Sequence, residues 1–423
     1  MKNDGNILKN PIITYLTIII YPLWTLFISF KYFRMPHSKN LFWLFCIFLG
    51  TIHIYFPEGR DDADGFRYAK RLTELYQEPV SFANFTSSFY EDGEFIDFYQ
   101  PVITYFLSTV TKNPRWLFLI FAIVYGFFYS RNCWFVLSKF PKYIGFPLFF
   151  LTLYFILICP IWNINGVRMW TAFHVFAYGA LHYLYNSDKS KSIWCLISLL
   201  IHFSFIIPLI ILVIYHFFPK SLRLFLAIYL ISLFIKEINI EPIKNILLSY
   251  TPALLSNKLT SYTNESYIQQ VIEAKSNLNF YVEGSKTVVD VIISIFFFVL
   301  CVWGKTMVNN NIKILNLVCF SLFIYSICNI LSTIPSIQRF FLLCQLFSLV
   351  SIILFYITFK QYRFKNKVII LIFKVLPVLL LFPVLVILRQ GCEFYGISLF
   401  FNPVASLFIS DNQPLIQLIK SII

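Results

Sequence analysis

The residues best suited to chemistry gather in one segment, which runs from Pro57 to Tyr99. This segment holds half of the twenty acidic residues of the chain and lies between two apolar runs. A chain that is 58% hydrophobic has little reason to gather carboxylates unless they meet water, a cation or a substrate. A solvated loop is the plain alternative, and the spacing of the residues argues against it.

Spacing places several of these side chains on one face of a helix. From Arg60 to Arg71 the sequence fits a helix, on which Asp61 shares a face with Asp64. Arg67 and Tyr68 follow Asp64 at helical spacing, so they lie on its face as well. A carboxylate, a guanidinium and a phenol on one face can hold an anionic substrate and remove a proton from it.

The three aspartates of this predicted helix differ in how well they suit the part of a general base. Asp64 ranks first, because the guanidinium of Arg67 lies within reach and a nearby guanidinium keeps a carboxylate ionised. Asp61 ranks second because it shares the face, and Asp62 ranks third because it points elsewhere. A structural cation site and a solvated loop are the alternatives for all three.

Two arginines are predicted at the outer starts of membrane-spanning helices. Asn165 is a predicted N-cap, which puts Arg168 on the first turn of its helix. Arg339, in PSIQRFF, repeats this arrangement after a proline. Together with Arg67, these arginines predict a pyrophosphate site, because a guanidinium binds phosphate oxygens in pairs. The alternative is that both are interfacial arginines whose side chains reach for water.

His202 interrupts the apolar run from Ile193 to Phe218. Two short helices that meet near His202 would keep Lys220 and Arg223 on the basic side of the membrane. A histidine at an outer-facing helix break is predicted to face substrate, so we include it among the catalytic candidates. A packing histidine with satisfied hydrogen bonds is the alternative.

A membrane frame must position these residues. Only 13% of the 423 residues are charged, and apolar runs of about 17 to 25 residues, long enough to cross a bilayer, recur along the chain. The net charge of +14 comes from Lys and Arg in short loops between these runs, which is typical of membrane proteins and not of nucleic-acid binding. The nine cysteines lack metal-site spacing and are expected to pack as apolar residues.

The pattern predicts an all-α polytopic membrane protein with about twelve transmembrane helices plus interfacial helices. We expect the whole chain, 1–423, to form a single integral membrane domain. Two segments are predicted outside the membrane, the acidic loop at 57–99 and a second segment at 240–286. The first span is predicted from Ile12 to Phe33, whereas the piece from Pro101 to Thr111 is too short to cross and is predicted to be interfacial.

Several segments between about residues 55 and 345 form a recognisable series. They read DADGFRY, IDFYQPVITYFLSTVTKNPRW, YGFFYSRN, NGVRMWTAFHVFAYGALHYL, LLIHFSFIIPL and SIQRFF. In this order and spacing they resemble the EpsG-like branch of bacterial exopolysaccharide and O-antigen polymerases. The resemblance implies a GT-C-like membrane glycosyltransferase at the outer face of the bacterial inner (cytoplasmic) membrane. Such an enzyme would join undecaprenyl-diphosphate-linked oligosaccharide repeat units into a polymer.

The resemblance also implies roles for particular residues. In the GT-C class an acidic residue of the first large external loop commonly serves as base or metal ligand, which assigns that role to Asp61, Asp62 or Asp64. The basic role falls on Arg168 and Arg339. The other residues expected to bind substrate are Arg67, Tyr68, Asp97, Tyr99 and Asn165. The chain departs from the simplest GT-C layout, because its acidic loop follows the second predicted span and not the first.

Motifs for other chemistry are missing from the sequence. It contains no Walker loop, dinucleotide fingerprint, HExxH, GxSxG or paired-cysteine motif, so chemistry driven by ATP or soluble nucleotides has no support. We expect no cofactor and assign no metal ligand, and a divalent metal stays an open alternative. The expected partners are the lipid-linked oligosaccharide substrate, membrane lipids, a chain-length regulator and a flippase, with no nucleic acid.

Two other functions stay open at this point. One is a GT-C glycosyltransferase that adds single sugars from a lipid-monophosphate donor. The other is a flippase for lipid-linked oligosaccharides. A flippase should line a central cavity with charges from many spans, whereas the charges here gather at one face, which favours an enzyme.

Overall fold

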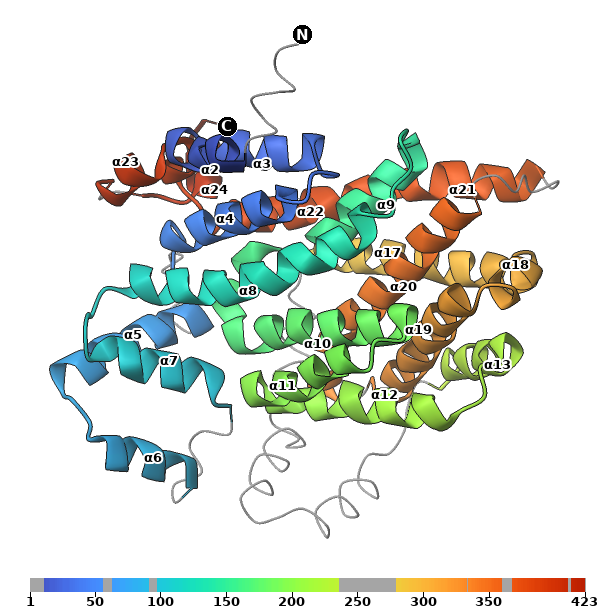
Figure 1. Cartoon of the computed structure of the whole chain (residues 1–423), viewed down its shortest axis with the longest axis horizontal. Coiled ribbons are helices and arrows are strands. Elements are labelled where there is room, and N and C mark those ends of the chain that lie inside the picture. The colour runs from blue at the N-terminus through green and yellow to red at the C-terminus, as the bar shows by residue number, and fades with distance from the viewer. Residues whose placement is uncertain are drawn as a thin grey trace.

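The computed structural model of the chain describes residues 11–55, 63–90, 97–235, 279–332, 334–359, 367–409 and 412–422. Throughout these ranges the regular structure is helical, apart from an isolated β-bridge between Gly396 and Pro414. A helix satisfies its own backbone hydrogen bonds, as an apolar chain in lipid requires. The all-α prediction is therefore confirmed for the described part of the chain (Figure 1).

Short turns and 3-10 helices join the α-helices. In the first half of the chain the helices are α2 (Pro11–Ile20), α3 (Pro22–Lys31), α4 (Ser38–Thr51), α5 (Asp64–Gln77), α6 (Phe82–Tyr90), α7 (Tyr99–Ser108), α8 (Pro114–Leu137), α9 (Phe146–Leu157), η1 (Ile161–Gly166), α10 (Val167–Asn186), η2 (Ser190–Ser192), α11 (Ile193–Ile201), η3 (Phe203–Phe205), α12 (Ile206–Phe217) and α13 (Leu222–Ser232). In the second half they are α17 (Phe280–Val302), α18 (Lys305–Asn309), α19 (Ile312–Ile330), η4 (Pro335–Phe340), α20 (Phe341–Thr358), α21 (Lys367–Leu379), α22 (Leu381–Gly391), η5 (Ile397–Phe400), α23 (Pro403–Leu407) and α24 (Leu415–Ile422). Figure 1 shows α5, α6 and α7 together at one end of the molecule.

Six helical segments of the described chain are long and apolar enough to cross a membrane. They are Pro114–Leu137, Phe146–Asn186, Phe280–Val302, Ile312–Ile330, Ile337–Thr358 and Lys367–Gly391. Three shorter apolar helices accompany them, at Ser190–Ile201, Phe203–Phe217 and Leu222–Ser232. The predicted class, a helical membrane protein with several spans, is therefore confirmed. The number of about twelve spans and the GT-C-like fold stay predictions.

The first predicted span is not one continuous helix. The backbone of Tyr21 is extended, with φ −155° and ψ 102°, and it separates α2 from α3. Pro22 opens α3 and has no N–H to donate to the preceding turn, which favours a new helix start at this point. The two pieces pack against each other instead. The prediction of one span from Ile12 to Phe33 is therefore wrong.

The piece predicted to be interfacial forms α7. Its 10 residues extend about 15 Å at about 1.5 Å per residue, which is half the thickness of a bilayer core. α7 packs against α5 and α8 and so holds α5 at the end of the bundle. The prediction that this segment is too short to cross is confirmed.

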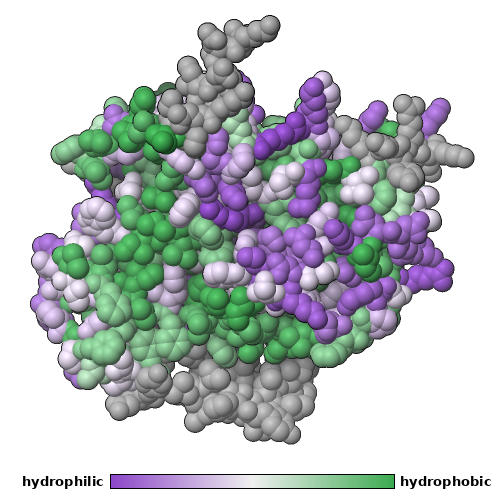
Figure 2. All heavy atoms as spheres, in the orientation of Figure 1, coloured by the Kyte–Doolittle hydropathy of each residue, from purple (hydrophilic) through white to green (hydrophobic). Residues whose placement is uncertain are grey.

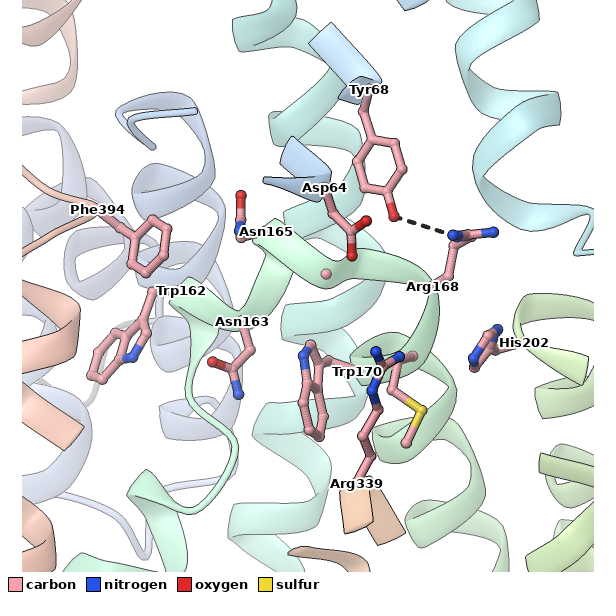
Figure 3. Close-up of a pocket in the computed structure, with 12 residues that line it drawn as sticks. Asp64, Tyr68, Trp162, Asn163, Asn165, Arg168, Trp170, His202, Arg339 and Phe394 are labelled. Carbon is pink, nitrogen blue, oxygen red and sulfur yellow. Dashed lines mark hydrogen bonds between the residues drawn. The ribbon is translucent and has the colours of Figure 1, made fainter. Parts of the chain in front are cut away.

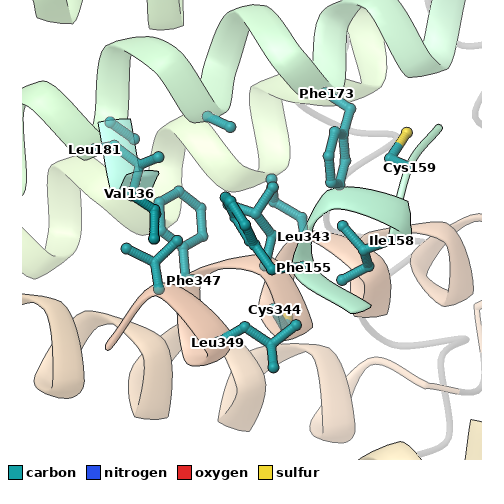
Figure 4. Close-up of a cluster of buried hydrophobic side chains, with 14 of the residues drawn as sticks. Val136, Phe155, Ile158, Cys159, Phe173, Leu181, Leu343, Cys344, Phe347 and Leu349 are labelled. Atoms are coloured by element: carbon teal, nitrogen blue, oxygen red, sulfur yellow. The ribbon is translucent and has the colours of Figure 1, made fainter. Parts of the chain in front are cut away.

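Large apolar side chains fill the space between α8, α9, α10 and α20 (Figure 4). Phe155, Phe173 and Phe347 are buried there. On the other side of α8, α4 approaches closely because the contact is lined by small residues. A Cβ on Gly50 would lie 2.3 Å from the Cβ of Ala122. This packing fixes α8 and α10, and α10 carries much of the site described below.

α11 and α12 form a pair of helices that turns back at His202. The backbone of His202 is extended, with φ −152° and ψ 113°, and α11 ends there. Tyr183, near the end of α10, is hydrogen-bonded to His216, near the end of α12. α11 starts close to the C-terminal end of α10, and α12 ends close to it. The start of α11 and the end of α12 therefore lie at the same end of the bundle, and His202 lies at the other. The predicted helix break near His202 is confirmed.

The two ends of α10 differ in charge. At the C-terminal end, Lys139 and Lys313 lie over the ring of Tyr185, at 5.1 and 5.5 Å from its centroid. At the N-terminal end, Arg168 is paired with Asp97. The 20 residues of α10 extend about 30 Å, roughly the thickness of the hydrocarbon core. In Figure 2 hydrophilic residues gather in the right half, where Figure 1 places α13 and α18.

This polarity leads to a prediction about orientation. By the positive-inside rule, the lysine-rich end is expected in the cytoplasm and the other end of α10 outside. A cysteine in place of Asn412 is expected to react with a membrane-impermeant maleimide in intact cells, because the C-terminal tail lies near Trp162 at the outer end. The same result is expected at Glu91, which lies outside the described residues.

A cysteine in place of Lys313 is the control, and it should react only after the cells are lysed. The parent chain sets the background, since eight of its nine cysteines are buried. Labelling of Lys313→Cys but not of Asn412→Cys in intact cells would mean that the orientation is reversed.

Candidate active site

A pocket of about 310 Å³ lies at the N-terminal end of α10 (Figure 3). Its lining combines acidic, basic, amide and aromatic side chains. The lining residues are Asp64, Tyr68, Trp162, Asn163, Asn165, Gly166, Arg168, Met169, Trp170, His202, Arg339 and Phe394. Six of the residues that the sequence analysis singled out are thus brought together, namely Asp64, Tyr68, Asn165, Arg168, His202 and Arg339.

α5 brings Asp64 and Tyr68 to the pocket. The helix begins at Asp64, and its apolar face packs against α7 and η1. Tyr68 lies one turn later on the same face, as the spacing predicts. Arg67 forms an ion pair with Asp64, but its side chain is 64% exposed and does not line the pocket. Asp61 and Asp62 lie outside the described residues.

Asn165 joins η1 to α5. Its Oδ1 accepts a hydrogen bond from the backbone N–H of Gly65 at 3.2 Å. A Cβ on Gly65 would lie 2.2 Å from this oxygen, so the close approach depends on glycine. The prediction that Asn165 caps α10 is wrong, because Gly166 occupies the N-cap position. The chain enters α10 from the 3-10 helix η1, and as a result the Asn165 side chain is directed to α5 and not to α10.

Asp97 is a buried junction behind the pocket. Its side chain is 6% exposed, and its Oδ2 accepts hydrogen bonds from His202 Nδ1 at 2.8 Å and from Arg168 Nη1 at 3.2 Å. Its Oδ1 accepts from the backbone N–H of Phe203 at 2.8 Å. Burial acts to raise the pKa of Asp97, but the hydrogen bonds and charges of these partners outweigh it and hold the pKa below its usual range. Asp97 is therefore a carboxylate that fixes two pocket residues.

Two predicted substrate contacts do not reach the pocket. Asp97 lies behind His202 and Arg168 and is not part of the lining. Tyr99 is directed toward the interior, where its ring lies 5.9 Å from that of Phe121. Although Asp97 and Tyr99 are only two residues apart, Asp97 lies behind the pocket and Tyr99 packs between helices.

Arg168 is held in place by two partners. Its Nε donates to the hydroxyl of Tyr68 at 3.3 Å and its Nη1 donates to Asp97. Burial raises the pKa of Tyr68 to about 12, with the charge of Asp64 in the same direction and that of Arg168 opposing it. Tyr68 is therefore a neutral phenol at physiological pH. The guanidinium has five N–H donors, so three remain to bind a ligand.

Arg339 enters the pocket from a different part of the fold. It belongs to η4, the 3-10 helix before α20, and its side chain is exposed. No hydrogen bond or ion pair engages it among the described residues. Two guanidiniums from separate elements, those of Arg168 and Arg339, thus line one pocket, which is an arrangement suited to a phosphate or diphosphate.

His202 presents one ring nitrogen to the pocket. Because Nδ1 is bonded to Asp97, Nε2 is the nitrogen left for a ligand, and it has no hydrogen-bond partner in the described part of the chain. A carboxylate bonded to Nδ1 fixes the tautomer and the orientation of the ring. This pair can accept a proton from a bound hydroxyl or hold that hydroxyl in place.

An aromatic and amide end of the pocket was missed by the sequence analysis. Trp162, Asn163, Trp170 and Phe394 lie there. The signal that could have found three of them is PIWNINGVRMW, which puts two of the eight tryptophans around two asparagines at a predicted outer helix start. Nothing in the sequence points to Phe394, which is brought close by the fold alone.

Metal ligands are not gathered at this site. Among the described residues, no three side chains of His, Cys, Asp or Glu come together as a metal ion would require. Two groups in the pocket can accept a proton, the Asp64 carboxylate and the His202 ring. Two others, the guanidiniums of Arg168 and Arg339, can bind an anion.

Comparison with known proteins gives one match. A family model described as the EpsG family matches residues 73–401 of the chain. The match includes Arg168, His202, Arg339 and Phe394, whereas Asp64 and Tyr68 precede it. No curated protein and no solved structure matches the chain.

Proposed function

Because this chain belongs to the EpsG family, we propose that it is a polysaccharide polymerase of the bacterial inner membrane. It joins undecaprenyl-diphosphate-linked oligosaccharide repeat units at the outer face of that membrane. The observation that supports this function most directly is the pocket, in which a carboxylate and two guanidiniums meet at the end of the bundle opposite the lysines.

The reaction is a glycosyl transfer between two lipid-linked molecules. The growing chain, attached to its lipid diphosphate, is the donor, and an incoming lipid-linked unit is the acceptor. A hydroxyl oxygen of the acceptor forms a bond to the anomeric carbon of the donor. The bond from that carbon to the diphosphate oxygen breaks, and the lipid diphosphate leaves with the electron pair. The hydroxyl proton passes to a base of the protein.

Arg168 and Arg339 bind the diphosphate of the donor. Negative charge on the leaving oxygens grows as the bond breaks, so guanidiniums placed beside them stabilise the transition state more than the ground state. Asp97 and Tyr68 hold Arg168 in position before substrate arrives. No nucleotide is required, because the bond to the lipid diphosphate is already activated.

Asp64 is the proposed base. It lines the pocket on the first turn of α5, and a Cβ on Gly166 would lie 3.7 Å from its Oδ2, so the carboxylate lies close to the start of α10. An acceptor hydroxyl bound beside the two guanidiniums would be within reach of it. Asparagine at this position would keep the shape and remove the proton acceptor.

His202 is the second candidate for the base. Its support is the hydrogen bond to Asp97, which leaves Nε2 on the pocket side and would stabilise a protonated ring. Its position inside the range matched by the family model adds to this support. In that case Asp64 would bind the acceptor and not take its proton.

The two rival functions differ in what a deletion strain lacks. Loss of the long polysaccharide ladder with single repeat units retained indicates a polymerase. Loss of complete repeat units, with truncated ones in their place, indicates a transferase for single sugars. Retention of complete lipid-linked units on the cytoplasmic side indicates a flippase. The paired guanidiniums favour a diphosphate over the monophosphate donor of the single-sugar transferase.

Changing Asp97 to asparagine is expected to lower both activity and thermal stability. The carboxylate accepts from His202 and Arg168 on Oδ2 and from the Phe203 N–H on Oδ1, whereas an amide has one oxygen and an NH2 group. One of these two sets of donors therefore faces an NH2 group, and the negative charge that pairs with Arg168 is lost. The expected loss of stability is about 1–3 kcal/mol. Polymer formation and the melting temperature of the purified protein measure the two effects. Unchanged values of both would show that the buried junction does not position the pocket residues.

A further inference from the structure

The two ends of the pocket differ in chemistry. In Figure 3 Arg168 and His202 lie on one side, Trp162 and Phe394 lie on the other, and Trp170 and Arg339 lie between them. The first side suits the diphosphate described above. The second side has flat apolar rings and an amide, so it suits a different, uncharged part of the ligand.

The fold holds the two tryptophans of this second side firmly. Trp162 packs on Gly391, where a Cβ would lie 3.3 Å from three atoms of the indole ring. Trp170 packs on Gly166 in the same way, with a Cβ there 3.1 Å from Cδ1 and Nε1. Glycine at both positions allows the rings to lie directly against the backbone. Fixed rings lose little conformational entropy when a ligand binds on them.

Polar groups at this end lack strong partners. The indole N–H of Trp162 is buried and has no hydrogen-bond acceptor in the described part of the chain. The amide of Asn163 makes one long contact, 3.5 Å to the sulfur of Cys159. An amide can both donate and accept, and a buried indole N–H calls for an acceptor. A ligand rich in hydroxyl groups can both donate to and accept from the amide of Asn163.

We propose that Trp162, Asn163, Trp170 and Phe394 form a subsite for the sugar ring that is attached to the diphosphate, and that this sugar is uncharged. The proposal rests on the proposed function, since it takes the anion end to bind the diphosphate. The C–H groups of a sugar ring carry partial positive charge and stack on the negative face of an aromatic ring. These four side chains are uncharged and offer no partner to the carboxylate of a uronic acid, and the guanidinium of Arg339, which Figure 3 shows beside Trp170, is taken up by the diphosphate.

The size of the pocket agrees with one ring. Ligand pockets range from roughly 300 to 1,000 Å³, and this one measures about 310 Å³. It accommodates a diphosphate with a single sugar, and the rest of the oligosaccharide must extend beyond it. The subsite therefore contacts only the first sugar, and its selectivity does not extend to the sugars further along the chain.

Binding of two probes to the purified full chain in nanodiscs tests the subsite. The probes are farnesyl diphosphate and the same lipid diphosphate carrying N-acetylglucosamine, titrated by calorimetry. We expect the sugar to tighten binding about tenfold. In Trp162→Leu and Trp170→Leu this gain should vanish, while the affinity for farnesyl diphosphate holds and shows that the variants are folded. Trp303→Leu, at an exposed position at the end of α17, is the matched control and should keep the gain.

The outcomes separate the subsite from the proposed function. If farnesyl diphosphate binds but the sugar adds nothing, or both variants keep the gain, the subsite is wrong and the diphosphate site stands. If a probe carrying glucuronic acid binds as tightly as the first sugar probe, the claim of an uncharged sugar is wrong. If neither probe binds the unaltered chain, the diphosphate site fails and the subsite fails with it.

Discussion

Replacing Asp64 with asparagine is expected to abolish the polysaccharide ladder while the amount of protein in the membrane stays the same. Asparagine keeps the shape of the side chain but cannot take the proton of the acceptor hydroxyl. Loss of a general base slows a reaction by about 10²–10⁴-fold. The side chain lies on the first turn of α5 and is partly exposed, so the change should not unfold the protein. Complementation of a deletion strain, read on a gel of its polysaccharide, measures the effect.

Two controls belong with this variant. Glu74→Gln removes a carboxylate from the same helix at an exposed position away from the pocket, and it should leave the ladder intact. Asp62→Asn is expected to leave it nearly intact as well. A normal ladder from both Asp61→Asn and Asp64→Asn would show that neither aspartate is the base. Asp97 is buried behind the pocket, so His202 would then be the next candidate for the base.

Replacing Arg168 with lysine is expected to lower activity by about 10²–10³-fold, as loss of one donor to a developing anion does in other enzymes. Lysine keeps the charge but has no planar fork. It cannot bond Tyr68 and Asp97 and still offer paired N–H groups to a diphosphate. Polymer formation should fall, and the affinity for farnesyl diphosphate should fall with it.

Arg339→Lys is expected to have the same direction and a smaller effect, because Arg339 is exposed and makes no bond to other described residues. Arg223→Lys is the matched control, at an exposed position of α13 toward the lysine-rich end. Full activity in both Arg168→Lys and Arg339→Lys would leave the two arginines as interfacial anchors only.

Local patterns in the sequence were sufficient for the elements and for part of the site. Apolar runs predicted a helical membrane protein, and the interruption at His202 predicted a helix break that the structure has. Helical spacing put Asp64 and Tyr68 on one face, and both line the pocket. These features depend on residues a few positions apart, and the 3.6-residue period of the helix determines which of them share a face.

Tertiary structure decided which elements meet. Asp97 bonds Arg168 across 71 residues and His202 across 105, and Asn165 bonds Gly65 across 100. No local period reports such a pairing, because it depends on how α5, η1, α10 and the turn after α11 pack together. For the same reason the sequence assigned Asn165 to its own helix, overlooked Phe394 and did not indicate that Asp97 lies behind the candidate pocket. A buried carboxylate and a partly exposed one look alike in a sequence, and only the packing around them puts Asp97 behind the pocket and Asp64 in its lining.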